Sequence, residues 1–526
     1  MKLTGQNFLG NQFSSQGDKK FNAIDPTNGE KLTPDFTEAT VPEVDEAARK
    51  AASAFSDYRK TNATQRADFL ECIAQEIEKA GEELINRCQQ ETGLPEVRIS
   101  GELGRTTNQL RLFAGLLREG SWVNARIDTS DPDRKPVPKP DVRTMQIALG
   151  PVGVFGASNF PLAFSVAGGD TASALAAGCP VVVKAHPAHP GTSELVGNAI
   201  RNAILECKMP EGTFSMVHGK SNEVGLAIVK NKYIKAIGFT GSFRGGKALY
   251  DAASGREEPI PVYAEMGSVN PVFILPGAMK TKSAEIAAGL TASITLGVGQ
   301  FCTNPGLVIT EENHSKELFY KELSESVSKT EAGTMLTESI QQAYDLGRKN
   351  LLNQSGVRQI ALGKEGKKGF IGTASVYQVN SPDFLRNDGL EEEIFGPSSL
   401  LVSAKDNQDL ISIASKMKGH LTASLFGLEE ELDNYKDLIK ILEQKVGRLI
   451  INGFPTGVEV CHAMNHGGPF PATTDSRTTS VGTASIYRFT RPVCYQNFPD
   501  HLLPEELQQD NPMDLWRLFN GEWTRS

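Results

Sequence analysis

One cysteine stands where a catalytic nucleophile could work. Cys302 follows the stretch 289–299, which is rich in small residues and ends in Gly299. Glycine at this point lets the backbone come close to a ligand. A thiol that attacks a carbonyl carbon also needs a base and a donor for the oxyanion that forms. Glu265, in the run Ala264-Glu265-Met266-Gly267, is the candidate base, and Cys302 is the candidate nucleophile.

Two polar side chains follow neighbouring predicted strands. Asn159, in the run Ser158-Asn159-Phe160-Pro161, comes after the predicted strand 152–155 and could donate its amide hydrogen to an oxyanion. Lys184 ends the predicted strand 181–184, where its ammonium group could reach a ribose hydroxyl. The two positions predict an oxyanion donor and a nucleotide contact at the ends of adjacent strands.

A glycine-rich turn and an acidic turn complete the set. Gly241 and Ser242 end the run Gly238-Phe239-Thr240-Gly241-Ser242 and open a predicted helix. Glycines and a hydroxyl at a helix N-terminus suit pyrophosphate, although the run is not G-x-G-x-x-G and is a weak indication by itself. Glu393 and Phe395 place a carboxylate and an aromatic ring in the predicted turn 392–397.

Each of these residues also has a structural interpretation. Asn159 could be an ordinary turn residue, Lys184 a solvated strand end, and Glu265 the partner of any lysine. Cysteine is among the most often buried residues, so an arbitrary one of the seven cysteines is expected in the core. For any one residue alone the structural interpretation is the better one. The order in which the residues occur together favours an active site instead.

The elements that must position these residues alternate in type from residue 150 onward. The predicted strands are 152–155, 181–184, 214–217, 236–239 and 262–265, and the predicted helices are 162–177, 194–207, 224–229 and 247–253. Repeated β-α-β units of this length specify an α/β fold with a doubly wound parallel sheet. Ligands of such sheets bind beyond the carboxyl ends of the strands, where most of the candidate residues fall.

The rest of the chain is predicted to add helices, a second α/β region and an extended arm. Helical patterns cover 64–80 and 103–117, and the second α/β region, 266–460, starts with the predicted strand 271–275. The proline-rich segment 136–141 leads into the predicted strand 142–149. We expect this strand to pair with the extended segment 486–495.

Composition narrows the class of protein. The 526 residues are 39% hydrophobic and 22% charged, typical of a globular protein with two or three domains. A formal net charge of −9 argues against nucleic acid or an anionic membrane as a partner. The N-terminus has no apolar signal segment, and no apolar run approaches the ~18 residues of a membrane span. Seven scattered cysteines without a C-x-x-C pair predict reduced thiols and a cytoplasmic protein.

The ordered motifs resemble those of the aldehyde dehydrogenase superfamily over residues 20–500. The matching segments are 158–161, 183–184, 239–242, 265–267, 299–302 and 393–397. The resemblance implies a Rossmann-like nucleotide-binding domain (1–135 and 150–265), an α/β catalytic domain (266–480) and a β oligomerisation arm (136–149 and 481–500). Residues 501–526 would be a C-terminal extension, and the assembly a homodimer or homotetramer.

The resemblance also implies roles for single residues. Cys302 would be the nucleophile, Glu265 the general base, and Asn159 the oxyanion donor, assisted by the Cys302 backbone N–H. The contacts with an NAD(P) cofactor would come from Lys184, Gly241, Ser242, Glu393 and Phe395. A small aldehyde would be oxidised to a carboxylic acid through a thiohemiacetal and a thioester. No metal is implied.

Departures from the family pattern bear on the substrate. Many members carry Gly-Gly-Lys in the run after the glutamate, whereas this chain has Gly267-Ser268-Val269-Asn270, and Ser158 replaces a common aromatic. Four stretches, 105–111, 157–163, 455–459 and 511–517, are most similar to 2,5-dioxopentanoate (α-ketoglutarate semialdehyde) dehydrogenases. The alternative is an NADP-dependent long-chain fatty aldehyde dehydrogenase. A coenzyme A-acylating enzyme and a non-catalytic relative are disfavoured because Glu265 and Cys302 are both present.

The residues after Lys184 predict the cofactor. NAD-selective relatives commonly carry a glutamate three residues after this lysine, and its carboxylate binds both ribose hydroxyls. Pro187 takes that place here, which removes the repulsion of a 2′-phosphate and favours NADP, with NAD as the other possibility. His186 and Lys220 are candidate phosphate partners. In the alternative interpretation, both are solvated surface residues.

Arg105 predicts a substrate with a second, remote carboxylate. It falls where relatives place an apolar residue of the aldehyde tunnel, and Phe160 is a further candidate substrate contact. Arginine in an apolar tunnel is costly unless paired, and a carboxylate is its natural bidentate partner. The alternative is a salt bridge to Glu102. The two histidines beside the presumed tunnel loop, His462 and His466, are expected to be structural.

Overall fold

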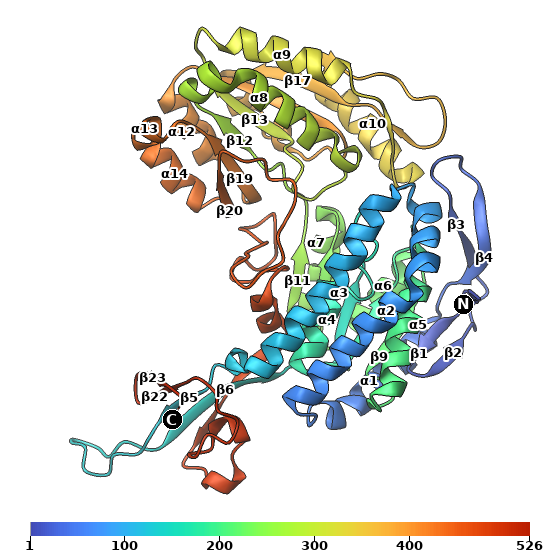
Figure 1. Ribbon diagram of the computed structural model, residues 1–526, viewed down its shortest axis with the longest axis vertical. Coiled ribbons are helices and arrows are strands. Elements are labelled where there is room, and N and C mark those ends of the chain that lie inside the picture. The colour runs from blue at the N-terminus through green and yellow to red at the C-terminus, as the bar shows by residue number, and fades with distance from the viewer. Residues whose placement is uncertain (1, 526) are drawn as a thin grey trace.

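The first of three large sheets contains the predicted parallel strands. The computed structural model describes residues 2–525 (Figure 1). Seven strands follow the order β11-β10-β7-β8-β9-β1-β2. They are β1 (Asn7–Leu9), β2 (Gln12–Ser14), β7 (Val152–Phe155), β8 (Val181–Lys184), β9 (Phe214–Val217), β10 (Ala236–Thr240) and β11 (Val262–Glu265). Strands β7 to β11 are parallel, and the order reverses between β7 and β10. The predicted doubly wound sheet is confirmed.

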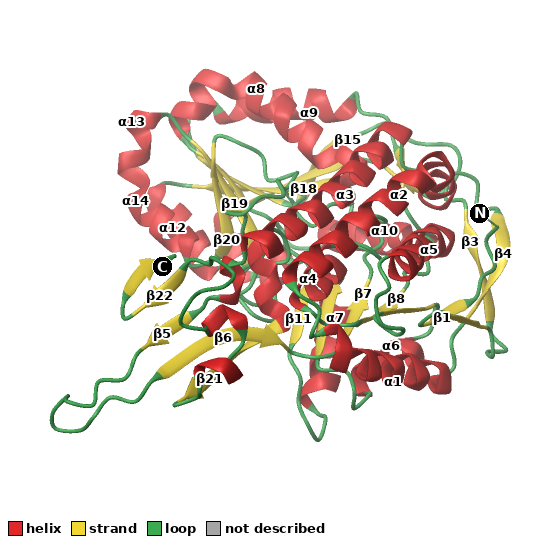
Figure 2. Cartoon of the chain, turned by 60° about the horizontal axis from the view of Figure 1, so that its bottom comes forward, coloured by secondary structure: helices red, strands yellow, loops and turns green. Residues whose placement is uncertain are grey.

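Helices cover both faces of this sheet because its strands are apolar on both sides. Val181 and Val183 of β8 belong to one core with α2 (Ala63–Thr92), α3 (Glu96–Glu119), α4 (Gly169–Ala177) and α5 (Pro190–Glu206). Val182, between them, belongs to a core with α1 (Val41–Tyr58), α6 (Asn222–Lys230) and α7 (Phe243–Ser254). Side chains that alternate across a buried strand require such a double covering, and Figure 2 shows both helical layers.

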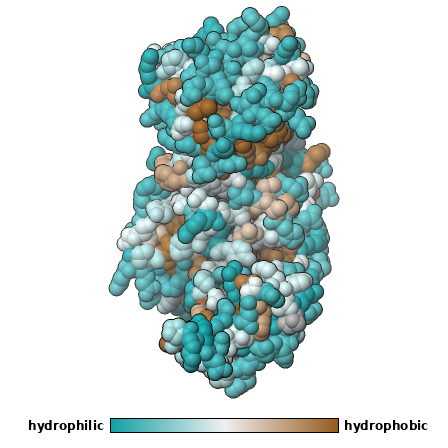
Figure 3. Space-filling view, turned by 90° about the vertical axis from the view of Figure 1, so that its left-hand side faces the viewer, coloured by the Kyte–Doolittle hydropathy of each residue, from teal (hydrophilic) through white to brown (hydrophobic). Residues whose placement is uncertain are grey.

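The second sheet, β15-β17-β18-β13-β12-β19-β20, carries the nucleophile's loop. Its strands are β12 (Val272–Ile274), β13 (Leu307–Glu311), β15 (Arg358–Leu362), β17 (Ser375–Asn380), β18 (Ser398–Ala404), β19 (His420–Phe426) and β20 (Val446–Ile451). Only β15 is antiparallel. Its main helices are α8 (Pro276–Thr295), α9 (Lys316–Ser328), α10 (Glu338–Leu352), α12 (Asn407–Lys416) and α14 (Lys436–Glu443). Figure 3 shows hydrophobic side chains gathered where this part faces the rest of the molecule.

The third sheet extends away from the other two (Figure 1). Its order is β21-β6-β5-β22-β23, with strands β5 (Arg126–Asp128), β6 (Val142–Ala148), β21 (Thr490–Gln496), β22 (Arg517–Phe519) and β23 (Glu522–Thr524). Strands β6 and β21 are antiparallel, with Ala148 opposite Thr490, so the predicted pairing is confirmed. The C-terminal hairpin β22–β23 prolongs the sheet beyond β5. Within residues 2–525, no helix is long and apolar enough to cross a membrane.

Two predicted elements begin several residues later than the sequence pattern indicated. The helix expected over 162–177 begins only at Gly169. The carboxylate of Glu102 accepts the backbone N–H groups of Leu162 and Ala163 at 2.9 and 3.0 Å, and this holds the preceding segment as a loop. The extended segment 486–495 becomes a strand only at Thr490, because residues 483–489 form a 3₁₀ helix.

Candidate active site

Cys302 lies in the loop between α8 and β13, close to the acidic turn 393–397. Gly297, Val298 and Gly299 reach it with φ of 55°, 57° and 64°. Gly299 packs so tightly against the backbone of Gly396 and Pro397 that a β-carbon would collide with both. Glycine is therefore required at position 299. The contact brings two of the predicted motifs together.

Glu265, the predicted base, is held in place from several sides at the end of β11. Its backbone oxygen accepts the Gly241 N–H at 3.0 Å, and the residue pairs with Thr473 of the C-terminal segment. Ser480 Oγ donates to its Oε2. The residue is only 3% exposed. The carboxylate is thus oriented before any substrate binds.

His466 joins this base to the nucleophile. Its Nε2 lies 3.0 Å from Oε1 of Glu265 and 3.4 Å from Sγ of Cys302. The histidine is 1% exposed, and its backbone N–H donates to Thr479 Oγ1 at 2.8 Å. The expectation of a merely structural role does not account for this position. Sequence reasoning missed it because 164 residues separate His466 from Cys302.

The charges of the site favour a neutral thiol beside an ionised carboxylate. Burial raises the pKa of the Cys302 thiol well above its ordinary value, and the neighbouring Glu265 carboxylate adds to the shift. Burial also opposes ionisation of Glu265, but His466 and the Ser480 hydrogen bond outweigh it, so the pKa of this carboxyl is lowered. A thiol in this state must lose its proton as it attacks, and the Glu265 carboxylate is an acceptor within hydrogen-bond reach of it.

Asn159 links the loop after β7 to the loop of Cys302. Its Nδ2 donates to the backbone oxygen of Gln300 at 3.0 Å, and its own backbone oxygen accepts from Arg98 at 3.4 Å. A side-chain amide carries two N–H groups, so this bond leaves one of them for an oxyanion. The side-chain amide therefore lies beside the loop of the nucleophile, and its role as oxyanion donor stays a prediction.

Asn270 braces the backbone of the nucleophile. Its Nδ2 donates to the backbone oxygens of Cys302 at 2.8 Å and Asn304 at 2.9 Å. Its Oδ1 accepts from the hydroxyls of Ser268 at 2.9 Å and Thr422 at 3.0 Å. The run Ser268-Val269-Asn270 stood out in the sequence only as a departure from the family pattern. In the structure this departure supplies a support for Cys302.

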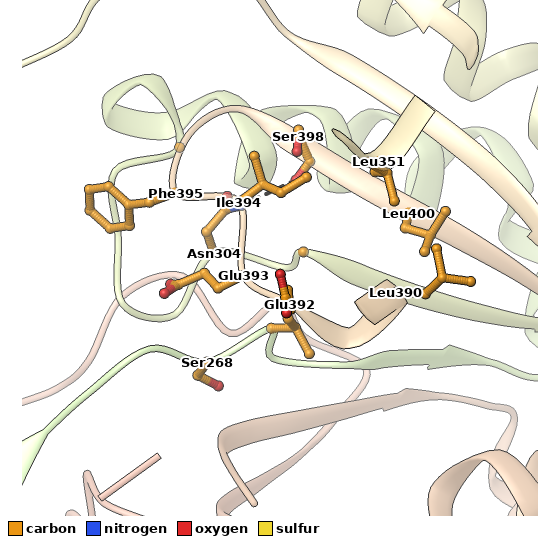
Figure 4. A pocket seen from close by; sticks show the side chains of 13 residues that line it. Ser268, Asn304, Leu351, Leu390, Glu392, Glu393, Ile394, Phe395, Ser398 and Leu400 are labelled. Carbon is orange, nitrogen blue, oxygen red and sulfur yellow. Dashed lines mark hydrogen bonds between the residues drawn. The ribbon is translucent and has the colours of Figure 1, made fainter. Parts of the chain in front are cut away.

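Glu393 and Phe395 line a recess beside the nucleophile's loop, together with Ser268, Gly299 and Asn304. Figure 4 shows both side chains on the same side of the turn, away from Leu351 and Leu400. The Glu393 carboxylate lies against Gly267, where a β-carbon would collide with it. It is open to water on one side, and the protein atoms packed against its other side raise its pKa to about 7.

Lys184 and the N-terminus of α7 lie at the carboxyl ends of two strands of the first sheet, β8 and β10. Lys184 ends β8, its Nζ donates to the Gly219 backbone oxygen at 2.6 Å, and burial lowers its pKa to about 8. Ser242 caps α7 by accepting the Gly245 N–H at 3.2 Å. Gly241 and Ser242 are exposed. The turn therefore presents the free first-turn amides of a helix to solvent.

The candidate partners of a 2′-phosphate differ in their surroundings. His186 stacks on His189, with ring centroids 5.4 Å apart, and burial lowers its pKa well below the ordinary value, so its imidazole is neutral. Pro187 is half-buried, and Lys220 is exposed. The backbone N–H of Lys220 donates to Glu38 at 2.7 Å. Because the imidazole of His186 is neutral, the Lys220 ammonium is the cationic candidate for binding a 2′-phosphate.

Arg105 does not form the alternative salt bridge to Glu102. Within residues 2–525, no carboxylate lies within ion-pair distance of its guanidinium, and its Nε and Nη2 are buried without hydrogen-bond partners. Glu102 instead approaches Arg98 at 3.4 Å. The Arg105 guanidinium lies over the rings of Phe160 and Phe164, at 5.6 and 5.3 Å from their centroids.

Phe160 connects Arg105 to the loop of the nucleophile. Its ring meets that of Phe301, next to Cys302, edge to face at 5.3 Å. Burial lowers the pKa of Arg105. Its positive charge acts on the Cys302 thiol in the direction of a lower pKa, against the larger effect of burial. His462, by contrast, is exposed and contacts Thr483 Oγ1 at 3.2 Å, outside this group of side chains. The predicted substrate contacts are therefore neighbours of the nucleophile.

Comparison with known proteins identifies the family. Residues 13–470 match the model of the aldehyde dehydrogenase family. The chain is 48% identical over 523 residues to alpha-ketoglutaric semialdehyde dehydrogenase 2 of Azospirillum brasilense, covering 99% of this chain and 100% of that one. It is 46% identical to the alpha-ketoglutaric semialdehyde dehydrogenase of Acinetobacter baylyi, covering 99% of each. The chain belongs to the aldehyde dehydrogenase family, whose members oxidise aldehydes to acids with NAD(P).

Solved structures share the fold. Betaine aldehyde dehydrogenase from Staphylococcus aureus in complex with NAD⁺ matches with a TM-score of 0.81 at 20% identity, over 94% of this chain and 96% of that one. A mutant of aldehyde dehydrogenase C from Pseudomonas syringae with NAD⁺ and octanal matches with a TM-score of 0.80 at 20% identity, over 94% and 97%.

Proposed function

We propose that this protein oxidises 2,5-dioxopentanoate (α-ketoglutaric semialdehyde) to 2-oxoglutarate, with NADP⁺ as the preferred cofactor. The observation that carries the substrate is the unpartnered guanidinium of Arg105, buried among aromatic rings beside the nucleophile. A substrate carboxylate would accept hydrogen bonds from both unpartnered nitrogens, Nε and Nη2. The names of the two relatives that match over their full length agree with this substrate.

Cys302 attacks the aldehyde carbon in the first step. The thiol proton passes to the ionised carboxylate of Glu265, which hydrogen-bonds the thiol, and is released to solvent before the second step. Nε2 of His466, 3.4 Å from the sulfur, donates to that carboxylate and orients it. The carbonyl oxygen becomes an oxyanion that accepts hydrogen bonds from Asn159 and the Cys302 backbone N–H. Such a donor is worth on the order of 10²–10³ in rate. The product of this step is a thiohemiacetal on Cys302.

Hydrolysis of the thioester completes the reaction. Glu265, ionised and oriented by Ser480 and His466, takes a proton from the attacking water. The Cys302 thiolate is the leaving group, and it takes up the proton that Glu265 removed from the water. Asn270 keeps the Cys302 backbone in place through both steps.

The residues present fit a nicotinamide dinucleotide. The α7 N-terminus, with Gly241 and Ser242, is built for pyrophosphate, and Lys184 and Glu393 offer a donor and an acceptor to ribose hydroxyls. Phe395 supplies an apolar face in the same recess. A bound nicotinamide would supply the hydride acceptor that turns the thiohemiacetal into the thioester.

Two features support NADP⁺ over NAD⁺. Pro187 places no carboxylate near the 2′ position, and the exposed Lys220 offers a cation. The nearby carboxylate of Glu38 is already engaged by the backbone N–H groups of Lys220 and Ser221, at 2.7 and 2.9 Å. The neutral His186 is a hydrogen-bonding group at most.

The three sheets have separate proposed roles. The first sheet binds the cofactor, the second carries the nucleophile, and the third forms the arm of a homodimer or homotetramer. All seven cysteines are free, which is expected of a protein kept in the reducing cytoplasm.

An aldehyde panel tests the proposal. Reduction of NADP⁺ and NAD⁺ is measured with 2,5-dioxopentanoate, hexanal and longer alkanals, each with and without coenzyme A. We expect the highest kcat/KM for 2,5-dioxopentanoate with NADP⁺, and no requirement for coenzyme A. A preference for long alkanals would replace the substrate assignment with the fatty aldehyde alternative, and a dependence on coenzyme A would replace the hydrolytic mechanism.

A further inference from the structure

The three side chains that meet at the nucleophile are also donor types that bind Zn²⁺. Cys302 Sγ, His466 Nε2 and a Glu265 carboxylate oxygen all lie within 4.8 Å of one another. Three protein ligands of these types, with a fourth position open, are typical of zinc sites that exchange a ligand. We propose that Cys302, Glu265 and His466 form a binding site for Zn²⁺, which occupies the nucleophile and reversibly inhibits the enzyme. The inhibition rests on the proposed function, whereas the binding does not.

The spacing of the donors agrees with tetrahedral coordination. Zn–S bonds of about 2.3 Å and Zn–N bonds of about 2.0–2.1 Å, at a tetrahedral angle, place sulfur and nitrogen about 3.5 Å apart. The sulfur of Cys302 and Nε2 of His466 are 3.4 Å apart. The same Nε2 lies 3.0 Å from Oε1 of Glu265. Binding therefore leaves the sulfur–nitrogen distance almost unchanged.

Access and support differ among the ligands. Glu265 and His466 are buried, whereas Cys302 is half-buried, so the ion reaches the site from the sulfur side. Nδ1 of His466 is buried and has no hydrogen-bond partner in the described part of the chain. Zinc-binding histidines usually donate this N–H, and its partner is worth about 10–100-fold in affinity. We therefore expect an affinity about 10–100-fold below that of a zinc site whose histidine has such a partner.

The binding reaction balances without a redox step. Bonds form from the metal to sulfur, nitrogen and oxygen, and the protons on the thiol and on Nε2 of His466 leave these atoms for solvent. The sulfur that must attack the aldehyde then lies in the coordination sphere. A chelator reverses the inhibition because no covalent bond within the protein has changed.

Matched substitutions test the site. Zn²⁺ is titrated into the reduced, full-length protein against a chromophoric chelator, without aldehyde. We expect one Zn²⁺ ion per chain. The affinity of His466→Gln for Zn²⁺ should be lower by at least about 10–100-fold, the loss that follows when only a partner of a metal ligand is removed. His462→Gln removes an exposed histidine four positions away and should bind as the wild type does. Equal affinities in the two variants would overturn the proposal.

Alkylation of the wild-type protein gives a test that needs no variant. The rates at which iodoacetamide modifies Cys302, Cys461 and Cys494 are followed by mass spectrometry in one sample. Zn²⁺ should slow modification of Cys302 alone. Equal rates with and without Zn²⁺ would contradict the site. If the protein oxidises aldehydes but does not bind Zn²⁺, the zinc site is refuted and the proposed function stands. If Zn²⁺ protects Cys302 in a protein that oxidises no aldehyde, the proposed function is refuted and the zinc site stands.

Discussion

Nε2 of His466 lies 3.0 Å from Oε1 of Glu265, in the interior of the protein, and so fixes the carboxylate from the side opposite Ser480. The contact comes from a C-terminal segment that folds back over the end of β11. A base that is oriented and ionised before the substrate arrives needs no rearrangement of its side chain before it acts. Its ionisation follows from its hydrogen bonds, which outweigh its burial.

Glu265→Gln should separate the two halves of the reaction. Glutamine keeps the hydrogen-bonding shape but takes no proton from water, so the acyl-enzyme forms and then persists. Stopped-flow measurement should show a burst of reduced cofactor followed by a steady rate about 10²–10⁴-fold below the wild type. Glu258→Gln, an exposed residue paired with Lys235, is the control and should turn over normally. Wild-type steady-state turnover in Glu265→Gln would remove this residue from the role of base.

Cys302→Ala should abolish aldehyde oxidation and leave cofactor binding nearly intact. The alanine removes the sulfur that forms the thiohemiacetal, while the candidate cofactor contacts lie on other elements. Dissociation constants for NADP⁺ from fluorescence titration, measured beside activity, check both halves of this statement. The same change at Cys461 is the control for losing a thiol. Residual oxidation by Cys302→Ala near the wild-type rate would refute the assignment of the nucleophile.

Pro187→Glu should shift the cofactor preference towards NAD⁺. The new carboxylate would meet a 2′-phosphate with like charge and would accept hydrogen bonds from the hydroxyls of NAD⁺. The ratio of kcat/KM for the two cofactors measures the shift, and Pro187→Ala separates the effect of charge from the loss of the proline ring. A wild-type enzyme that is at least as efficient with NAD⁺ as with NADP⁺ would contradict the proposed preference.

The KM for the cofactor should rise as the pH falls below about 7. The pKa of Glu393 is raised to about 7, so the carboxylate is the main form above that pH and protonates as the pH falls through it. A hydrogen bond to a charged acceptor is worth about 1 kcal/mol more than one to a neutral group, which corresponds to about fivefold in KM. Glu393→Gln should have the high KM at every pH. A pH-independent KM in the wild type would exclude this role.

Local motifs predicted the groups that lie at the ends of strands. Glu265 and Lys184 end strands that the apolar runs delimit, and Asn159 follows another. These positions depend on short segments whose pattern is visible in the sequence. The parallel sheet followed from the same runs, since β-α-β units leave few other arrangements.

Contacts between remote segments left no such pattern. His466 and Asn270 reach Cys302 from 164 and 32 residues away. The sequence marked one only as a neighbour of the presumed tunnel loop and the other only as part of a departure from the family pattern, and neither mark predicts a contact with the nucleophile. The loop before α4 escaped prediction for the same reason, because the buried carboxylate of Glu102 from another helix determines it. Sequence spacing reports local geometry, whereas these features arise only when the chain is folded.

The specificity of Arg105→Met tests the central claim most directly. A charge-assisted contact with the substrate carboxylate is worth roughly 1.5–3 kcal/mol, or about tenfold or more in KM at about 1.4 kcal/mol per decade. Arg111→Met, on the same helix and paired with Glu78, is the matched control. Steady-state kinetics of both variants with 2,5-dioxopentanoate and hexanal should show a large loss for Arg105→Met on 2,5-dioxopentanoate and little change on hexanal. An equal loss on both aldehydes would contradict the account, because it would make Arg105 a structural residue.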